Sequence, residues 1–413
     1  MLVVAVARFA AVVVGGWKPA YGDFAATLPG GYAERLNPTL WNSPDLSQSW
    51  AFHRAIYIHG PTQFLTLFPI VFLDSYAAIS RLLLVVYAVV IGAAVFVLWR
   101  IARALEPRTS PVAVVSAVLL FFPLLQAYSQ REFEVVIVLA TALLVLAALR
   151  DRQSLAGALA AYIAWFKYLP IALAGYLALR RWTRSILWFV LASAAWLALA
   201  HALFGLPRFV YHTRDDDIPI FRAAFGGNPL VAGRGDVCRA IQPVYDPAAL
   251  TQVSVRWALC GFANRGIGLP VLPVYLLILT AAAGVFVYGF VRLERALPAN
   301  ADRERWRRAF ELGIVSTVAS TFLFAHYYYL SVLAVPMIVL LARLRARPSR
   351  MRWAMWLLTY ACLSPFVVPI SAIDRVLHID SWRWYMQHSI YFFGVMLLVS
   401  WLEYEYVALG AVE

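Results

Sequence analysis

The sequence Tyr57-Ile58-His59-Gly60-Pro61-Thr62-Gln63-Phe64 closes a polar segment, residues 17–61, that stands between two apolar blocks of the chain. Charged and aromatic side chains alternate in this segment: Trp17, Tyr21, Asp23, Tyr32, Glu34, Trp41, Asp45, Trp50, His53, Arg54, Tyr57 and His59. Aromatic rings can stack on the apolar faces of a sugar, whose hydroxyls need polar partners. Aromatic residues also collect at membrane interfaces for reasons of solvation alone. Both interpretations make residues 17–61 a first outer loop at a membrane edge.

Hydrophobic residues make up 62% of the 413-residue chain, and charged residues make up 14%. Soluble domains of this length do not have such a balance, so the lipid bilayer is the expected solvent. The formal net charge is +13. In a membrane protein such an excess normally lies in cytoplasmic loops, so we expect no nucleic-acid partner. The composition predicts one integral membrane domain over residues 1–413, an all-α polytopic bundle of transmembrane helices.

Apolar stretches follow one another along the chain at lengths near those of membrane helices. The expected segments are residues 1–16, 77–99, 111–127, 135–149, 185–204, 269–291, 309–326, 328–343, 351–371 and 384–403. Residues 62–75 are too short to cross and indicate a re-entrant or interfacial helix. Arg8 interrupts the first segment, so we expect either that Arg8 points into the bundle or that a few residues precede the given start.

Residues 154–179 form the least regular membrane segment, because Lys167 and Pro170 interrupt it and three arginines follow directly. Both flanks are basic, so both ends should lie in the cytoplasm. The pattern favours a re-entrant hairpin of two short helices, with Lys167 near its tip. Broken backbone at membrane depth is tolerated where it lines a cavity. The alternative is one span kinked at Pro170, with Lys167 reaching to the interface.

One alternation of the segments places nearly every arginine cluster on the cytoplasmic side. The same alternation places four features on the outer side: Asp23, the cluster Gln130–Glu134, a large outer loop at 206–268 and His326. We therefore expect a multi-pass protein of the inner (plasma) membrane whose functional face is turned to the periplasm or the cell exterior.

Two features of the outer loop 206–268 bear on its chemistry. Cys238 and Cys260 share this loop, and an oxidising compartment would favour a disulfide between them. The run Asp215–Asp217 could bind a divalent cation, although a solvated turn is the simpler interpretation. No Cys/His spacing resembles a zinc site, and we expect neither a metal nor a cofactor.

Ionisable groups beside a bilayer are costly to place and point to function. Besides Asp23 and the cluster Gln130–Glu134, Lys167 and His326 should converge on the outer face. Cations at this boundary suit a lipid phosphate, and a carboxylate suits the deprotonation of an acceptor hydroxyl. Together these groups are the parts needed for glycosyl transfer from a lipid-phosphate sugar.

Each of these residues also has a purely structural explanation. Asp23 could cap the helix that follows it. Arg131 could form an ion pair with Glu132 or Glu134. His326 could be an interface histidine hydrogen-bonded to a carbonyl.

Several of these stretches together resemble the polytopic GT-C glycosyltransferases, specifically glycosyltransferase family 87. The matching stretches, in the order of the family pattern, are Gly22-Asp23-Phe24, Tyr57-Ile58-His59-Gly60-Pro61 with Phe68-Pro69, Ser129-Gln130-Arg131-Glu132, Ala156-Gly157 through Lys167-Tyr168-Leu169-Pro170, and His326-Tyr327 with Pro336. The chain departs from the pattern where Glu132 replaces Asn and where His59-Gly60-Pro61 replaces a Pro-Pro step. Those departures bear on the sugar and the acceptor more than on the reaction class.

The resemblance implies a GT-C fold and a polyprenyl-phosphate-sugar-dependent hexosyl- or pentosyltransferase. Such an enzyme would pass a mannose-like hexose to a glycolipid or polysaccharide acceptor. The resemblance implies that Asp23 is the catalytic base and that Lys167 and His326 lie near the donor phosphate. From its charge we assign Arg131 to the same phosphate. The residues expected to contact the substrate are Gln130, Glu132, His59 and Tyr57. The alternative is a transporter or flippase of a lipid-linked saccharide, although the sequence lacks the internal repeats usual in transporters.

Overall fold

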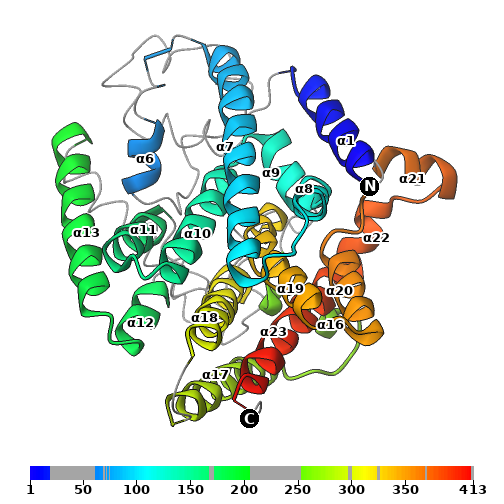
Figure 1. The fold of residues 1–413 in the computed structure, drawn as a ribbon. Helices are drawn as coiled ribbons and strands as arrows, with labels where there is room; N and C mark the ends of the chain where they lie inside the picture. The colour runs from blue at the N-terminus through cyan, green and yellow to red at the C-terminus, as the bar shows by residue number, and fades with distance from the viewer. Residues whose placement is uncertain are drawn as a thin grey trace.

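The computed structural model describes residues 1–18, 61–67, 70, 72–73, 75–166, 172–204, 253–295, 300–322, 326–367 and 370–410. Every secondary-structure element within these ranges is a helix (Figure 1). In this described part of the chain, five helical segments are long and apolar enough to cross a membrane, which makes the chain a multi-pass helical membrane protein. They are α7 (Tyr76–Leu105), α13 (Thr183–Phe204), α17 (Val271–Arg295), the 3-10 helix η6 (Tyr327–Leu333) continued by α19 (Ala334–Ala346), and α23 (Ile390–Ala408).

Twelve other helices of the described residues fill the bundle between these spans. They are α1 (Leu2–Gly15), α6 (Pro61–Leu67), α8 (Pro111–Leu119), α9 (Phe122–Gln130), α10 (Glu134–Leu149), α11 (Gln153–Phe166), α12 (Ala172–Leu179), α16 (Val255–Asn264), α18 (Ala301–Thr321), α20 (Arg350–Leu363), α21 (Ile370–Leu377) and α22 (Ser381–Gln387). In α1, Arg8 donates to the carbonyl of Val367 and stands over the ring of Phe122, 5.9 Å from its centroid. Arg8 therefore points into the bundle, which is one of the two alternatives that the sequence predicts for an arginine in this segment.

The segment predicted as one span at 111–127 is divided into α8 and α9, which are bent by 57°. Ser364 holds the break, because its hydroxyl accepts from the amide of Phe122 at 2.7 Å and donates to the carbonyl of Leu120 at 3.1 Å. Pro123 lies in the first turn of α9, where its missing N–H costs least. A partner from a distant part of the chain thus replaces the hydrogen bonds that a continuous helix would supply.

Helices α11 and α13 lie side by side (Figure 1), and two pairs of contacts show that they run in the same direction. Near their starts, the Ser185 hydroxyl donates to the Gln153 carbonyl at 2.8 Å. Farther along, the rings of Tyr162 and Trp196 are 6.0 Å apart. Because both helices begin at the same end of the bundle, the chain that joins them, α12 included, must return to that end. Residues 153–179 therefore enter and leave on one side, as the sequence predicts, although Lys167 lies outside the described residues.

The ends of α7 mark two opposite ends of the bundle. Near its start, the Ser80 carbonyl accepts from Arg131 at 3.0 Å, and near its end the Ala104 carbonyl accepts from Arg305 at 3.2 Å. These two carbonyls are 24 residues apart, or about 36 Å at the rise of an α-helix. That separation matches a bilayer with a hydrocarbon core of about 30 Å.

Arginine-rich turns gather at the Arg305 end. Arg308 donates to the carbonyl of Ala148 at 2.8 Å and forms an ion pair with Asp151 at 3.1 Å, which joins the α10–α11 turn to α18. Arg180, at the end of α12, is paired with Glu304 of α18. The turn after α10, the turn after α12 and the start of α18 therefore share one end, as their arginine content predicts.

Buried carboxylates hold this end together. Glu311 of α18 is fully buried and accepts from Arg307 at 2.8 Å, from the Tyr406 hydroxyl at 2.7 Å and from the Tyr176 hydroxyl at 3.0 Å. These contacts join α18 to α23 and α12. A buried charge is tolerated when such hydrogen bonds satisfy it.

A second buried carboxylate joins the C-terminal helices. Glu405 of α23 lies 2.8 Å from Arg343 of α19 and 2.8 Å from Arg352 of α20. Arg343 also stands over the Trp306 ring at 5.0 Å. The arginines at 343 and 352, expected to mark a cytoplasmic turn, are therefore also ligands of a buried acid.

The end of the predicted outer loop 206–268 is helical. It is described from residue 253, where Ser254 caps α16 by accepting from the amide of Trp257 at 3.1 Å. Phe262 of α16 packs on Phe392 of α23 with ring centroids 5.6 Å apart. This part of the loop is thus a helix packed against the bundle, because its apolar residues recur on one face.

The cysteines are partly accounted for. Cys260 is buried in α16 and disulfide-bonded, and Cys362 is a free thiol. Cys238 lies outside the described residues, so the pairing of Cys238 with Cys260 stays a prediction.

Candidate functional site

Arg131 stands at the tight corner between α9 and α10, in the left-handed backbone region (φ 63°). Its side chain is fully buried. Nε donates to the Ser80 carbonyl at 3.0 Å, Nη1 to the Tyr128 carbonyl at 3.3 Å, and Nη2 to the Gly16 carbonyl. Arg131 therefore joins the start of α7 and the end of α1 to the corner.

The charge of Arg131 is solvated by peptide dipoles. Its partners in the described part of the chain are carbonyls, so the ion pair with Glu132 or Glu134 that the sequence allows is not formed there. Burial lowers the pKa of Arg131, and the Tyr128 hydroxyl acts in the opposite direction. An arginine nevertheless stays protonated at neutral pH, so the corner holds a permanent cation.

Two carboxylates, Glu132 and Glu134, come directly after Arg131 in the sequence of the corner. Glu132 and Glu134 are both buried, and Gln130 is half-buried at the last position of α9. Glu134 occupies the first turn of α10, where the helix dipole favours a negative charge. A buried cation and two buried acids thus lie within five consecutive residues, 130–134.

The end of α11 packs directly on this corner. The rings of Phe133 and Phe166 are 5.8 Å apart in an edge-on arrangement, and Phe166 also contacts Tyr162 at 5.6 Å. Lys167 is the next residue after Phe166 in the sequence. Lys167 itself lies outside the described residues, but the backbone from which it continues is at the corner.

Helix α6 is fixed to the same part of α11. The Thr62 hydroxyl donates to the Tyr162 carbonyl at 2.9 Å, and the Thr66 hydroxyl lies 2.8 Å from the Tyr162 hydroxyl. Helix α6 begins at Pro61, directly after the Tyr57–Gly60 run. Tyr57 and His59 lie outside the described residues.

His326 precedes η6, which packs on α9 and α10. Its ring is stacked on Tyr328, with centroids 5.1 Å apart and planes 9° from parallel, and meets the edge of Tyr329 at 5.5 Å. Both tyrosines are buried. The imidazole is therefore held by aromatic packing rather than exposed on a loose turn.

The described structure thus brings together the corner 130–134, the end of α1, α6 and the end of α11, with η6 packed on both helices of the corner. The remaining predicted site residues, Asp23, Lys167, Tyr57 and His59, lie outside the described residues. Among the residues that are described, no group of three His, Cys, Asp or Glu side chains could hold a metal ion.

Sequence reasoning missed the buried acid Glu311. Its signal was present, because Arg307 lies four residues before it, and both Arg307 and Glu304 face along one side of α18. The pairing with Tyr406 was not predictable, since it joins positions 95 residues apart.

Comparison with known proteins adds no family: no family model and no curated protein sequence matches the chain. The class that fold and composition define is a multi-pass helical membrane protein.

Proposed function

We propose that this chain is a membrane glycosyltransferase of the GT-C type. It moves a mannose-like hexose from a polyprenyl-phosphate donor to a lipid-linked or cell-envelope glycan acceptor on the outer face of the membrane.

The proposed reaction is a single displacement with inversion. The acceptor hydroxyl oxygen forms a bond to the anomeric carbon while the bond from that carbon to the donor phosphate oxygen breaks. Asp23 accepts the hydroxyl proton, and polyprenyl phosphate leaves as an anion held by Lys167, His326 and Arg131. The phosphate leaves as a stabilised anion and needs no proton, so the proposed reaction requires one base and no general acid.

One observation supports the proposal above the others. Three described stretches that lead to Asp23, His59 and Lys167 in the sequence lie at the corner 130–134 or beside it, at the end of the bundle opposite the arginine-rich turns. Arg131 bonds to Gly16, Thr62 bonds to the α11 carbonyl at 162, and Phe166 packs on Phe133. Stretches that are far apart in sequence therefore have their anchors in one place.

The test is a donor screen. Purified protein would be incubated with synthetic polyprenyl-phosphate mannose, glucose and arabinose and a mixed glycolipid acceptor, and products would be identified by mass spectrometry. We expect one donor to yield polyprenyl phosphate and a new glycolipid in equal amounts. Absence of transfer from all three, with a folded protein, would refute the proposed donor class.

A flippase of lipid-linked saccharide is the second candidate. The observation in its favour is the pair of interrupted segments, α8–α9 with its 57° bend and the α11–α12 hairpin, because transporters break helices at membrane depth. Proteoliposomes separate the two functions. A flippase moves a fluorescent lipid-linked sugar across the bilayer without changing its mass, whereas a transferase changes the mass.

A further inference from the structure

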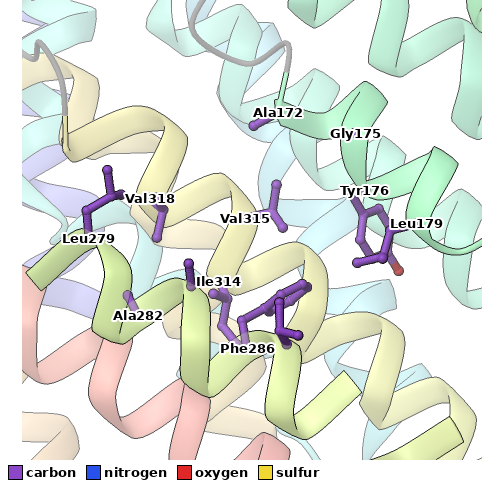
Figure 2. A pocket seen from close by; sticks show the side chains of 12 residues that line it. Ala172, Gly175, Tyr176, Leu179, Leu279, Ala282, Phe286, Ile314, Val315 and Val318 are labelled. Atoms are coloured by element: carbon purple, nitrogen blue, oxygen red, sulfur yellow. The ribbon is translucent and has the colours of Figure 1, made fainter. Parts of the chain in front are cut away.

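An apolar groove lies on the side of the bundle between α12, α17 and α18 (Figure 2). Its volume is about 260 Å³, and its wall includes Gly175, Tyr176, Ala282, Phe286, Ile314 and Val318. One end of it lies beside the arginine-rich end of the bundle, where Tyr176 bonds to Glu311. The proposed transfer reaction gives it no role.

The groove suits an apolar occupant. Tyr176 carries the one side-chain polar atom among its lining residues, and that hydroxyl donates to Glu311 at 3.0 Å. A buried water needs two to four polar partners, whereas an apolar cavity of about 150 Å³ in another protein stays dry and binds benzene. A groove of about 260 Å³ with its polar atom already engaged therefore has room for a hydrocarbon chain but little to hold water.

The groove is continuous with the membrane-facing surface. Helix α17 is one of the candidate spans. At the two lips of the groove, Leu179 of α12 is 41% exposed and Val287 of α17 is 52% exposed. A lipid chain can therefore enter sideways from the bilayer.

Basic side chains stand at the arginine-rich end of the groove. Arg180 donates to Glu294 at 3.5 Å, which brings the ends of α12 and α17 together. Arg181 follows α12 and Arg295 ends α17, and both are exposed. Neither has an ion-pair partner among the described residues, whereas Arg180 is engaged by acids. Such cations attract anionic lipid headgroups.

We propose that the groove binds one acyl chain of an anionic phospholipid and that Arg181 and Arg295 hold the lipid phosphate. The apolar lining, the opening toward the bilayer and the two exposed arginines support this assignment. This lipid is distinct from the donor of the proposed reaction, because the donor phosphate is assigned to the opposite end of the bundle.

Filling the groove tests the acyl-chain part. Ala283 lines the groove and is exposed, and Ala281 is an exposed alanine of the same helix that does not line it. Protein with Ala283→Trp should lose most of the phospholipid that copurifies in detergent, measured by native mass spectrometry and lipid extraction, while Ala281→Trp keeps it. Equal phospholipid in the two variants would overturn the proposal.

A labelling experiment needs no substitution and so does not depend on a variant folding. Wild-type protein in bilayers containing phosphatidylglycerol with a diazirine in its acyl chain would be irradiated and digested. Cross-links should concentrate on α12, α17 and α18 peptides that contain groove residues. Cross-links spread evenly over all exposed helices would show that the groove is ordinary lipid-facing surface.

Charge substitution tests the headgroup part. Arg181→Gln and Arg295→Gln should each weaken binding of phosphatidylglycerol about fivefold, with binding of phosphatidylcholine unchanged. Arg350→Gln, at an exposed arginine of α20 away from the groove, is the matched control. If phosphatidylglycerol and phosphatidylcholine bind the wild type equally, the assignment to an anionic lipid is wrong.

Discussion

At the scale of single residues, Arg131 has two roles to separate. Its guanidinium satisfies carbonyls from three places in the chain, at Gly16, Ser80 and Tyr128. It is also assigned to the donor phosphate in the proposed function. The carbonyls of Ser80, Tyr128, Ser129 and Gly16 use four of the five N–H donors of the guanidinium, which leaves one N–H on Nη2 for the phosphate.

Arg131→Met should therefore lower stability, because it leaves buried carbonyls without donors at roughly 1–3 kcal/mol each. We expect a lower melting temperature in detergent, and partial recovery with Arg131→Lys, whose ammonium lacks the planar fork. Arg350→Met, at an exposed arginine, should melt like the wild type. An unchanged melting temperature combined with lost donor binding would leave the phosphate role alone.

Asp23 also has two candidate roles, those of a base and a helix cap. Asp23→Asn keeps the size of the side chain but cannot accept a proton, so turnover should fall by roughly 10²–10⁴-fold while donor binding survives. Asn caps helices about as well as Asp. The capping explanation therefore predicts an active Asn variant and a destabilised Asp23→Ala variant, and transfer rates with melting curves for both decide between them.

At the scale of elements, the parallel contact of α11 and α13 depends on a glycine. A Cβ added at Gly157 would lie 2.0 Å from the Ser185 carbonyl oxygen. Backbone atoms cannot yield as a flexible side chain can. The two helices must separate if position 157 gains a side chain.

Gly157→Ala should consequently destabilise the protein by about 1–3 kcal/mol, despite the better helix propensity of alanine. Gly175→Ala in α12 is the matched control, because nothing lies within 4 Å of a Cβ there, and it should be neutral or slightly stabilising. Chemical denaturation or thermal melting of both proteins measures the difference. If the two variants melt alike, α11 and α13 are not packed as described.

Element prediction from the sequence worked where hydropathy alone decides the outcome. The runs of apolar residues located α13, α17 and the start of α7 to within a few residues, whereas the predicted span 384–403 begins inside α22 and ends before α23 does. The prediction failed at 111–127, which Ser364 divides from a distant part of the chain, and at α18, which begins at Ala301 after the local cap Asn300. The corner 130–134 was recognised as a polar cluster, but the left-handed turn and the carbonyl partners of Arg131 depend on neighbours that no local pattern encodes.

At the scale of the whole molecule, Glu311 of α18 joins two helices that are distant in sequence, α12 and α23. Glu311→Gln should cost about 1–3 kcal/mol, because it weakens the charge-assisted hydrogen bonds from Arg307, Tyr406 and Tyr176, while Arg307 keeps its ion pair with Glu294 at 2.8 Å. We expect a clear loss of melting temperature, measured at neutral pH in detergent. Glu106→Gln, at a half-buried acid of the α7–α8 turn without an ion-pair partner among the described residues, should show little change. A small effect of Glu311→Gln would mean that the tyrosine hydroxyls alone hold this junction.

The sidedness of the molecule follows from α7, whose two ends carry the corner 130–134 and the arginine-rich turns about 36 Å apart. Arginine-rich turns stay in the cytoplasm, so the corner and the candidate site should face outward. In a protein otherwise free of cysteine, Arg305→Cys should resist a membrane-impermeant thiol reagent in intact cells and react after lysis. Asn228→Cys, in the predicted outer loop, should react in intact cells. Labelling of Arg305→Cys from outside would reverse the orientation, and the lipid-linked donor would then have to be reached from the cytoplasm.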